Sequence, residues 1–137
     1  MDSILATLLQ GLPVLLGQLA ATLALLGIGM ACYIAVTPFN EWRLMREGNV
    51  AAGVVIAGTL VALALPLAST LATSVLVLDI VLWGLVALVI QLVTFMVATA
   101  LIRGLRGMIE AGNVAAALVL IGIQIAVALL NAGAMAG

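Results

Sequence analysis

The chain has 137 residues, of which 67% are hydrophobic and 7% are charged, and its mean hydropathy is +1.48. Four basic and five acidic residues give a net charge of -1, and the chain has no histidine. This composition excludes an ordinary soluble domain and indicates an integral membrane protein. Apolar segments recur up to the C-terminus, so the first segment is expected to be a retained span rather than a secretory signal peptide.

Four apolar segments are long enough to cross a hydrocarbon layer of about 30 Å, which needs about 20 helical residues. Their apolar residues occur on all sides of a helix, and a backbone in lipid must satisfy its own hydrogen bonds, so helices are expected rather than barrel strands. The sequence therefore predicts an all-α, polytopic membrane protein that forms a single transmembrane domain over residues 1–137. The expected spans are Leu12–Val36, Asn49–Leu71, Val75–Ile102 and Asn113–Ala136.

The basic residues predict the orientation of these spans. All four lie in the connections after the first and third spans, at Arg43, Arg46, Arg103 and Arg106. Cytoplasmic loops of inner-membrane proteins carry an excess of Lys and Arg, so both connections are expected in the cytoplasm and both termini on the outer side. The aromatic residues around the first connection are expected to act as interfacial anchors: Tyr33, Phe39 and Trp42.

A similar junction between a charged connection and an apolar span occurs twice, as "REGNVAAG" from Arg46 and "EAGNVAAA" from Glu110. Each junction follows an Arg-x-x-Arg pair and leads into an apolar span. The register continues from Gly58-x-x-x-Ala62 in the second span to Gly122-x-x-x-Ala126 in the fourth. This pattern predicts two helical hairpins that repeat in parallel orientation, about residues 12–71 and 75–136, around a pseudo-twofold axis along the membrane normal.

At each junction an asparagine stands where a helix N-cap is expected, at Asn49 and Asn113. The preceding Glu47 and Glu110 would lie near the positive end of the following helix. One interpretation is that these residues only begin two helices at the membrane surface. The other is that the paired helix N-termini form a site for an ion or a lipid headgroup.

Arginine and glutamate also occur four residues apart in both junctions, as Arg43 with Glu47 and Arg106 with Glu110. Exposed pairs of this spacing contribute only about 0.2–0.5 kcal/mol, so they are interpreted as a solvated collar at the interface. The alternative is a polar vestibule, in which Glu41, Glu47 and Glu110 face one another around an oligomer axis.

Asp79 is the acidic residue expected within a span, about five residues into the third. An unpaired carboxylate there needs water, a proton or a partner. Its partner is expected to be Asn131 near the outer end of the fourth span, a backbone amide, or a mobile proton or cation. Small and polar residues, including Gln91, follow on the same side of that helix, which is expected to face protein or a cavity.

Two glutamines are expected near the middle of the membrane, Gln91 in the third span and Gln124 in the fourth. A hydrogen bond between them would join the two helices, although such contacts average only about 0.6 kcal/mol. The alternative is that both side chains line a conduction path. Together with Asp79 and Asn131, they are the candidate residues of such a path.

The residue types needed for other chemistries are missing. The single Cys32 stands in an apolar span without a base, and no phosphate-binding glycine pattern or metal-ligand cluster occurs. Four arginines are too few for nucleic-acid binding. The chain is therefore expected to be neither an enzyme nor a holder of a metal or cofactor.

Three stretches resemble a known family: Thr37 to Ser69, "TPFNEWRLMREGNVAAGVVIAGTLVALALPLAS"; Asp79 to Val93, "DIVLWGLVALVIQLV"; and Asn131 to Met135, "NAGAM". They are similar to the YjfL-like bacterial inner-membrane proteins of domain-of-unknown-function family 350. The resemblance covers nearly the whole chain. It implies a four-helix inner-membrane protein of two repeats, in a family often associated with membrane-stress systems. It implies no activity.

Two functions from different classes follow. The first is a small oligomeric channel or transporter for ions or small solutes, because the chain carries intramembrane polar residues but is too small to form a pore alone. The second is a noncatalytic membrane scaffold, or a membrane-stress subunit that recruits partner proteins. In both cases the lipid bilayer and further copies of the chain are the expected partners.

Overall fold

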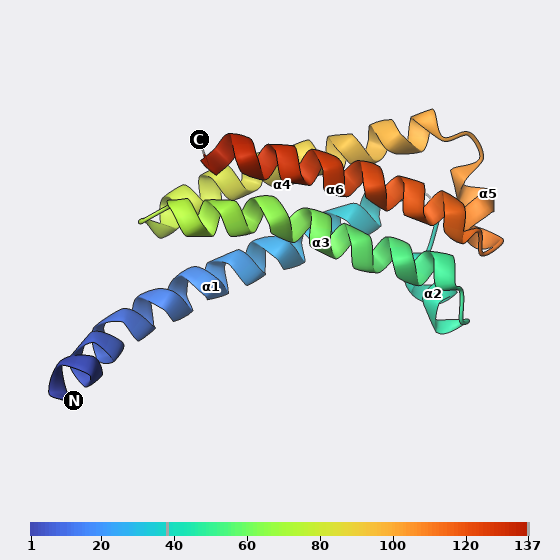
Figure 1. Cartoon of the computed structure of the whole chain (residues 1–137). Helices are drawn as coiled ribbons and strands as arrows, with labels where there is room; N and C mark the ends of the chain where they lie inside the picture. The colour runs from blue at the N-terminus through green and yellow to red at the C-terminus, as the bar shows by residue number, and fades with distance from the viewer. Residues whose placement is uncertain (38, 137) are drawn as a thin grey trace.

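The computed structural model describes residues 1–37 and 39–136, and over these ranges the protein is all helical. Four helices are long and apolar enough to cross a membrane: α1 (Asp2–Val36), α3 (Val50–Thr73), α4 (Val77–Leu101) and α6 (Val114–Ala136). Two short helices, α2 (Glu41–Arg46) and α5 (Leu105–Glu110), lie in the arginine-bearing connections. Figure 1 shows α2 and α5 at one end of the bundle, hereafter the loop end. The predicted all-α fold with four spans is confirmed.

The second, third and fourth spans begin and end close to the predicted residues, and the first ends at Val36 as predicted but begins earlier. Helix α1 begins at Asp2, well before the expected start at Leu12. The apolar run that precedes Leu12 continues the helix, and Pro13 does not end it. A proline removes one backbone donor, and a long apolar helix tolerates that loss in lipid.

Helix α3 is the centre of the bundle, in contact with every other helix, and its longest contact is with α6. A Cβ atom on Gly58 would lie 2.4 Å from the Ile121 side chain, so glycine allows the two helices to approach. The matched Gly122 has open space around it and is exposed. The two small-residue pairs predicted from the repeat therefore lie in different environments.

Only the second half of α1 belongs to the bundle. Its buried residues begin at Leu25, whereas its side chains up to Gly17 are exposed. The Gln18 Nε2 group donates a hydrogen bond of 3.0 Å to the carbonyl of Val75, at the turn between α3 and α4. Figure 1 shows the preceding part of α1 extending beyond this turn without a neighbouring helix.

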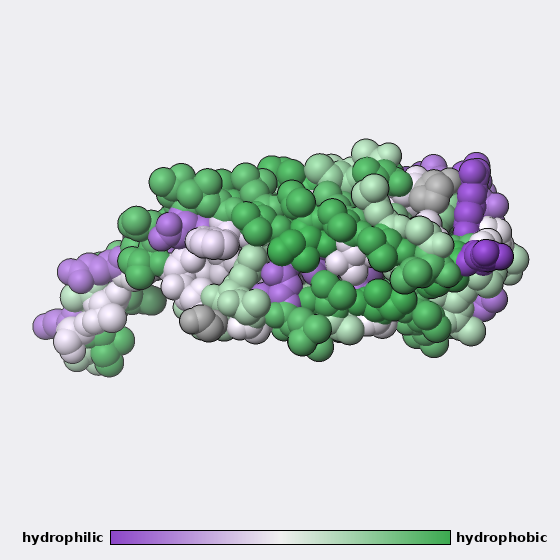
Figure 2. Space-filling view, turned by 90° about the horizontal axis from the view of Figure 1, so that it is seen from above, coloured by the Kyte–Doolittle hydropathy of each residue, from purple (hydrophilic) through white to green (hydrophobic). Residues whose placement is uncertain are grey.

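The surface of the bundle has the distribution expected of a protein in lipid. Large apolar side chains are exposed along the outer faces of all four long helices. Figure 2 shows hydrophobic residues over the middle of the molecule and hydrophilic residues gathered at the loop end. Tyr33 and Phe39, expected as interfacial anchors, are instead buried in the core, at 1% and 5% exposure. The Tyr33 ring packs edge-on against Phe95, with centroids 4.6 Å apart.

Candidate functional site

The first junction ends α2 and begins α3 within three residues. Gly48 has a φ of 85°, a left-handed conformation that favours glycine. Its N–H donates to the carbonyl of Met45, and the N–H of Asn49 donates to that of Leu44, which is the Schellman pattern of a helix C-terminus. The Asn49 side chain then accepts a 3.0 Å hydrogen bond from the N–H of Ala52 and caps α3.

The second junction repeats this pattern at the same offset that separates the two asparagines. Gly112 has a φ of 82°, its N–H donates to the carbonyl of Ile109, and Asn113 caps α6 through the N–H of Ala116. Both predicted N-caps are confirmed. In addition, the Asn49 Nδ2 group donates to the Ile109 carbonyl at 2.8 Å, which joins the two junctions side by side.

The arginine–glutamate pairs form, but they are exposed and differ in geometry. The Nε atom of Arg106 lies 3.0 Å from Oε1 of Glu110, whereas the Nε atom of Arg43 lies 3.8 Å from Oε1 of Glu47. Exposed pairs contribute about 0.2–1 kcal/mol at most, so these four residues form a solvated collar around the loop end. Arg106 and Glu110 each stand one residue further from their N-cap, Asn113, than Arg43 and Glu47 stand from Asn49. The two pairs therefore do not occupy equivalent positions of the repeat.

Glu41, the third member of the expected vestibule, is buried inside its own chain at 2% exposure. The hydroxyl of Tyr33 donates a hydrogen bond of 2.5 Å to its Oε1 atom. Sequence reasoning missed this contact between a span and a loop helix. The separation between Asn49 and Asn113 makes Glu41 equivalent to Leu105 in the repeat, and Leu105 is an apolar residue that is also buried. This equivalence could have indicated that Glu41 is buried.

A pocket of about 360 Å³ lies over Glu41 at the loop end, and Arg43, Arg106 and Glu110 line it. Burial raises the pKa of the Glu41 carboxyl to about 7, and the hydrogen bond from Tyr33 opposes this rise because it favours the charged form. Glu41 therefore exchanges its proton close to neutral pH. No group of three or more residues suited to a metal ion occurs in the described ranges.

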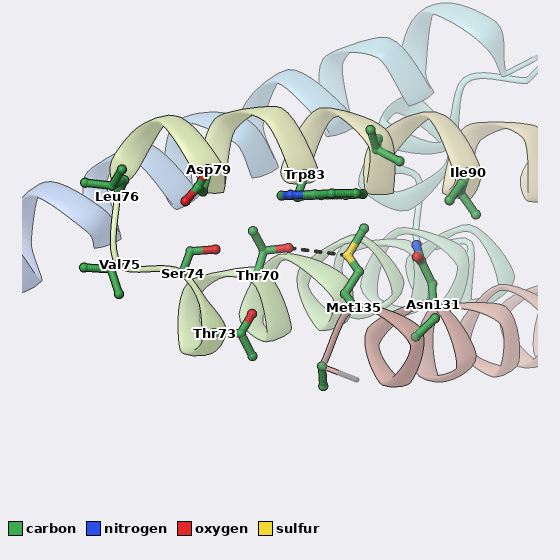
Figure 3. A pocket seen from close by; sticks show the side chains of 13 residues that line it. Thr70, Thr73, Ser74, Val75, Leu76, Asp79, Trp83, Ile90, Asn131 and Met135 are labelled. Atoms are coloured by element: carbon green, nitrogen blue, oxygen red, sulfur yellow. Dashed lines mark hydrogen bonds between the residues drawn. The ribbon is translucent and has the colours of Figure 1, made fainter.

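At the opposite end of the bundle, a groove of about 1010 Å³ lies between the ends of α3 and α6 and the beginning of α4. Figure 3 shows Asp79 and Trp83 on α4 facing Thr70 on α3 and Met135 on α6. The Thr70 hydroxyl donates to the Met135 sulfur at 3.4 Å. The other residues that line the groove are Thr73, Ser74, Val75, Leu76, Val86, Ile90, Asn131, Ala134 and Ala136.

Asp79 lies nearer the helix end than expected, in the first turn of α4, and is partly exposed. An acidic side chain is stabilised there by the positive end of the helix. It lines the same groove as Asn131 but makes no hydrogen bond to it within the described ranges. Asn131 lies opposite Ile90, deeper along the groove than Asp79, so of the alternatives predicted for Asp79 the direct pairing with Asn131 is not present.

The two glutamines meet in the interior, where both are buried. The Gln91 Nε2 group donates to the backbone carbonyl of Gln124 at 3.2 Å rather than to its side chain. One buried polar atom on each glutamine, together with one on Thr59 and one on Asn131, has no hydrogen-bond partner among the described residues. These atoms are Gln91 Oε1, Gln124 Nε2, Thr59 Oγ1 and Asn131 Nδ2.

Comparisons with known proteins identify a family of unknown function. The family described as Domain of Unknown Function (DUF350) matches residues 7–135. The proteins named UPF0719 inner membrane protein YjfL from Escherichia coli K12 and O157:H7 are each 40% identical over 72 residues, 53% of this chain and 54% of theirs. The chain thus spans about half the length of the curated relatives it matches. No solved structure is significantly similar to it.

Proposed function

We propose that this chain, which belongs to the DUF350 family and is a multi-pass protein of the inner membrane, moves protons or other small cations across that membrane. The observation that carries the proposal is the set of buried polar side chains with unpartnered atoms: Thr59, Gln91, Gln124 and Asn131. Leaving one such group unpaired costs about 1–3 kcal/mol, which a purely structural bundle would avoid with apolar residues. Water or a passing ion supplies the missing partner.

Three of these side chains, Thr59, Gln91 and Gln124, lie at a similar depth in the bundle, and Asn131 lies nearer the far end. At about 1.5 Å per residue, Thr59 and Gln124 lie about 14–15 Å from the loop ends of their helices, and Asn131 lies about 26 Å away. Because α3, α4 and α6 contact one another and Gln91 bonds to the Gln124 carbonyl, we infer that these polar side chains provide a path inside one chain. We therefore place the path within the bundle rather than along an oligomer axis.

A carboxyl group lies toward each end of the bundle, beyond these polar side chains. Glu41 lies under the loop-end pocket beside Tyr33, and Asp79 lines the groove at the far end. A carboxyl with a pKa near neutrality is suited to take up and release protons at the loop end. Asp79 is the acceptor for a proton or cation at the other end.

Proteoliposomes loaded with a pH-sensitive dye test the proposal. With a potassium diffusion potential as the driving force, the wild-type protein should carry a proton or cation current. Asp79→Asn keeps the shape of the side chain but removes its charge, so it should abolish the current. The matched control is Glu47→Gln, which removes an exposed carboxylate of the collar and should leave the current unchanged.

If the wild-type protein carries no current across a broad set of ions and voltages, the transport proposal fails. A current that survives Asp79→Asn and Gln124→Leu together would also exclude a path along the interior polar side chains. In either case the measurement is interpretable only if the variants remain folded, which circular dichroism of the same preparation establishes.

A noncatalytic scaffold, or a membrane-stress subunit, is the second candidate, and the part of α1 that extends beyond the bundle favours it. Over this stretch large apolar side chains such as Leu5, Leu8 and Leu9 are exposed and contact no other helix. Partner proteins of the membrane-stress class, or a second copy of the chain, would cover such a surface. Crosslinking from a photoreactive residue at Leu8 in intact membranes should then capture a partner.

We also propose that the chain forms a homo-oligomer. The support is the same exposed stretch of α1 together with the exposed pair Gly122 and Ala126 on α6, because small residues four apart allow helices to approach closely in lipid. Mass measurement in native lipid decides the question. A monodisperse single chain would contradict this proposal, while the path inside one chain would remain open to the flux test.

A further inference from the structure

The groove at the far end of the bundle has walls of two kinds. Its lining is mostly apolar, with Val86, Ile90 and Met135 along its length, and hydroxyl groups from Thr70 and Ser74 stand near the turn. Its volume of about 1010 Å³ is at the upper end of the range of small-molecule sites. A ligand that fits this lining has an apolar body, made of several rings or of a short hydrocarbon chain.

Asp79 is the one charged side chain among the described residues that line this groove. All four arginines are in the connections at the loop end, so no basic side chain neutralises it. The charge of the groove is therefore complementary to a cation. A phospholipid is a poor match, because its phosphate would bring a negative charge for which the lining offers no basic partner.

Trp83 lies one turn further along α4 than Asp79 and is 57% exposed. Figure 3 shows its indole ring on the side of the helix that faces the groove. An indole face attracts a cation and also stacks against an aromatic body. A carboxylate and an exposed indole side by side are the two groups that recognise an organic ammonium ion.

Asn131 gives an independent indication of a ligand. Its side chain is only 8% exposed, it lines the groove, and its Nδ2 group has no acceptor among the described residues. In Figure 3 its amide points from α6 toward α4, into the deeper part of the groove. A ligand oxygen at this depth would satisfy a donor that the protein leaves unpaired.

From these observations we propose that the groove binds a lipophilic monovalent cation that carries an ammonium group and a hydrogen-bond acceptor on an apolar body. The ammonium lies against Asp79 and the face of Trp83, and the acceptor oxygen lies at Asn131. The inference goes beyond the proposed movement of protons or small cations, because it assigns a larger organic ligand to the groove that contains Asp79. Binding itself does not require transport and is measured separately.

Rhodamine 6G is a suitable probe, because it is a lipophilic cation with an ester oxygen and it quenches tryptophan fluorescence. Its positive charge is shared by two alkylated nitrogens, which stand in for the ammonium group. The chain has two tryptophans, so a Trp42→Phe background leaves Trp83 as the reporter. Titration of the full chain in nonionic detergent micelles should show saturable quenching. Asp79→Asn should weaken the affinity by at least about tenfold, since it removes the one charge that the described lining of the groove offers to a cation.

Three controls separate the contributions. Asp2→Asn removes a carboxylate at the start of α1, outside the groove, and should leave the affinity unchanged. Asn131→Leu should weaken rhodamine 6G but not tetraphenylphosphonium, a cation without an acceptor oxygen. Fluorescein shares the ring system of the probe but is anionic, so it should not quench the unmodified protein even at high concentration.

The proposal is overturned if fluorescein binds as tightly as rhodamine 6G, or if folded Asp79→Asn binds the dye like the parent. It is also overturned if added ethanolamine phospholipid displaces the dye and Asp79→Asn abolishes retention of that lipid, because the occupant is then a membrane lipid. Dye binding without any current would support this inference and contradict transport. A proton current without dye binding would do the reverse.

Discussion

The hydroxyl of Tyr33 in the first span donates its hydrogen bond to the carboxyl of Glu41 in the first loop helix, and both side chains are almost completely buried. This contact fixes α2 against the end of α1. It also leaves an acidic group beneath a pocket where Arg43, Arg106 and Glu110 are the charged neighbours, and those residues are engaged in their own pairs. Because burial raises the pKa of Glu41 to about 7, this carboxyl gains or loses its proton near neutral pH.

A single tyrosine makes that proton directly observable. With carbon-13 at the ring Cζ atom, the one resonance of Tyr33 should shift with a midpoint near pH 7, because the pKa of Glu41 is raised to about 7. Glu41→Gln should abolish the shift, and Glu47→Gln should leave it in place. A midpoint near pH 4.5, the ordinary value, would show that Glu41 is in contact with water in solution.

The same group predicts how stability depends on pH. A carboxyl whose pKa rises from 4.5 to about 7 on folding binds more protons in the folded state between these values. Its contribution is fully present below pH 4.5 and is lost as the pH rises through about 7, by roughly 3 kcal/mol. Thermal unfolding in detergent should therefore show a larger loss between about pH 5 and about pH 8 for the wild type than for Glu41→Gln. Equal losses would contradict the buried position of Glu41.

Close packing between α3 and α6 gives a third prediction. Gly58→Ala places a methyl group against the Cβ and Cγ2 atoms of Ile121, so it should destabilise the bundle by about 1–3 kcal/mol. Gly122→Ala is the matched control on the facing helix, because nothing lies within 4 Å of its Cβ position. Unfolding in mixed detergent measures both variants. Equal stabilities would show that the two helices are farther apart than the structure has them.

The arginines predict the orientation, and cysteine labelling measures it. Cys32 is exposed, so a Cys32→Ala background is needed. Cysteines introduced at Ser3 and Ala136 should react with an impermeant reagent added to the outer face of the membrane, whereas one at Asn40 should not. The reverse pattern of labelling would place both arginine-bearing connections outside the cytoplasm.

Features that depend on a few consecutive residues could be predicted from the sequence. The spans follow from unbroken apolar runs, and the caps at Asn49 and Asn113 follow from the Gly-Asn pair that ends one helix and begins the next. Contacts between distant segments could not be predicted. The burial of Glu41 depends on how α2 folds back on α1, and the groove depends on where three helices end. Asp79 lies nearer the surface than expected because the turn before α4 extends to Leu76.

Helix α1 is 35 residues long, about 52 Å at 1.5 Å per residue, whereas an apolar bilayer interior is about 30 Å thick. The other spans, of 23 to 25 residues, need only a modest tilt to fit. Since α1 is apolar over most of its length, keeping the whole helix in hydrocarbon would require it to incline steeply or to thicken the lipid around it. The thickness of the host membrane, which depends on the chain length of its lipids, should therefore affect this protein mainly through the tilt of α1.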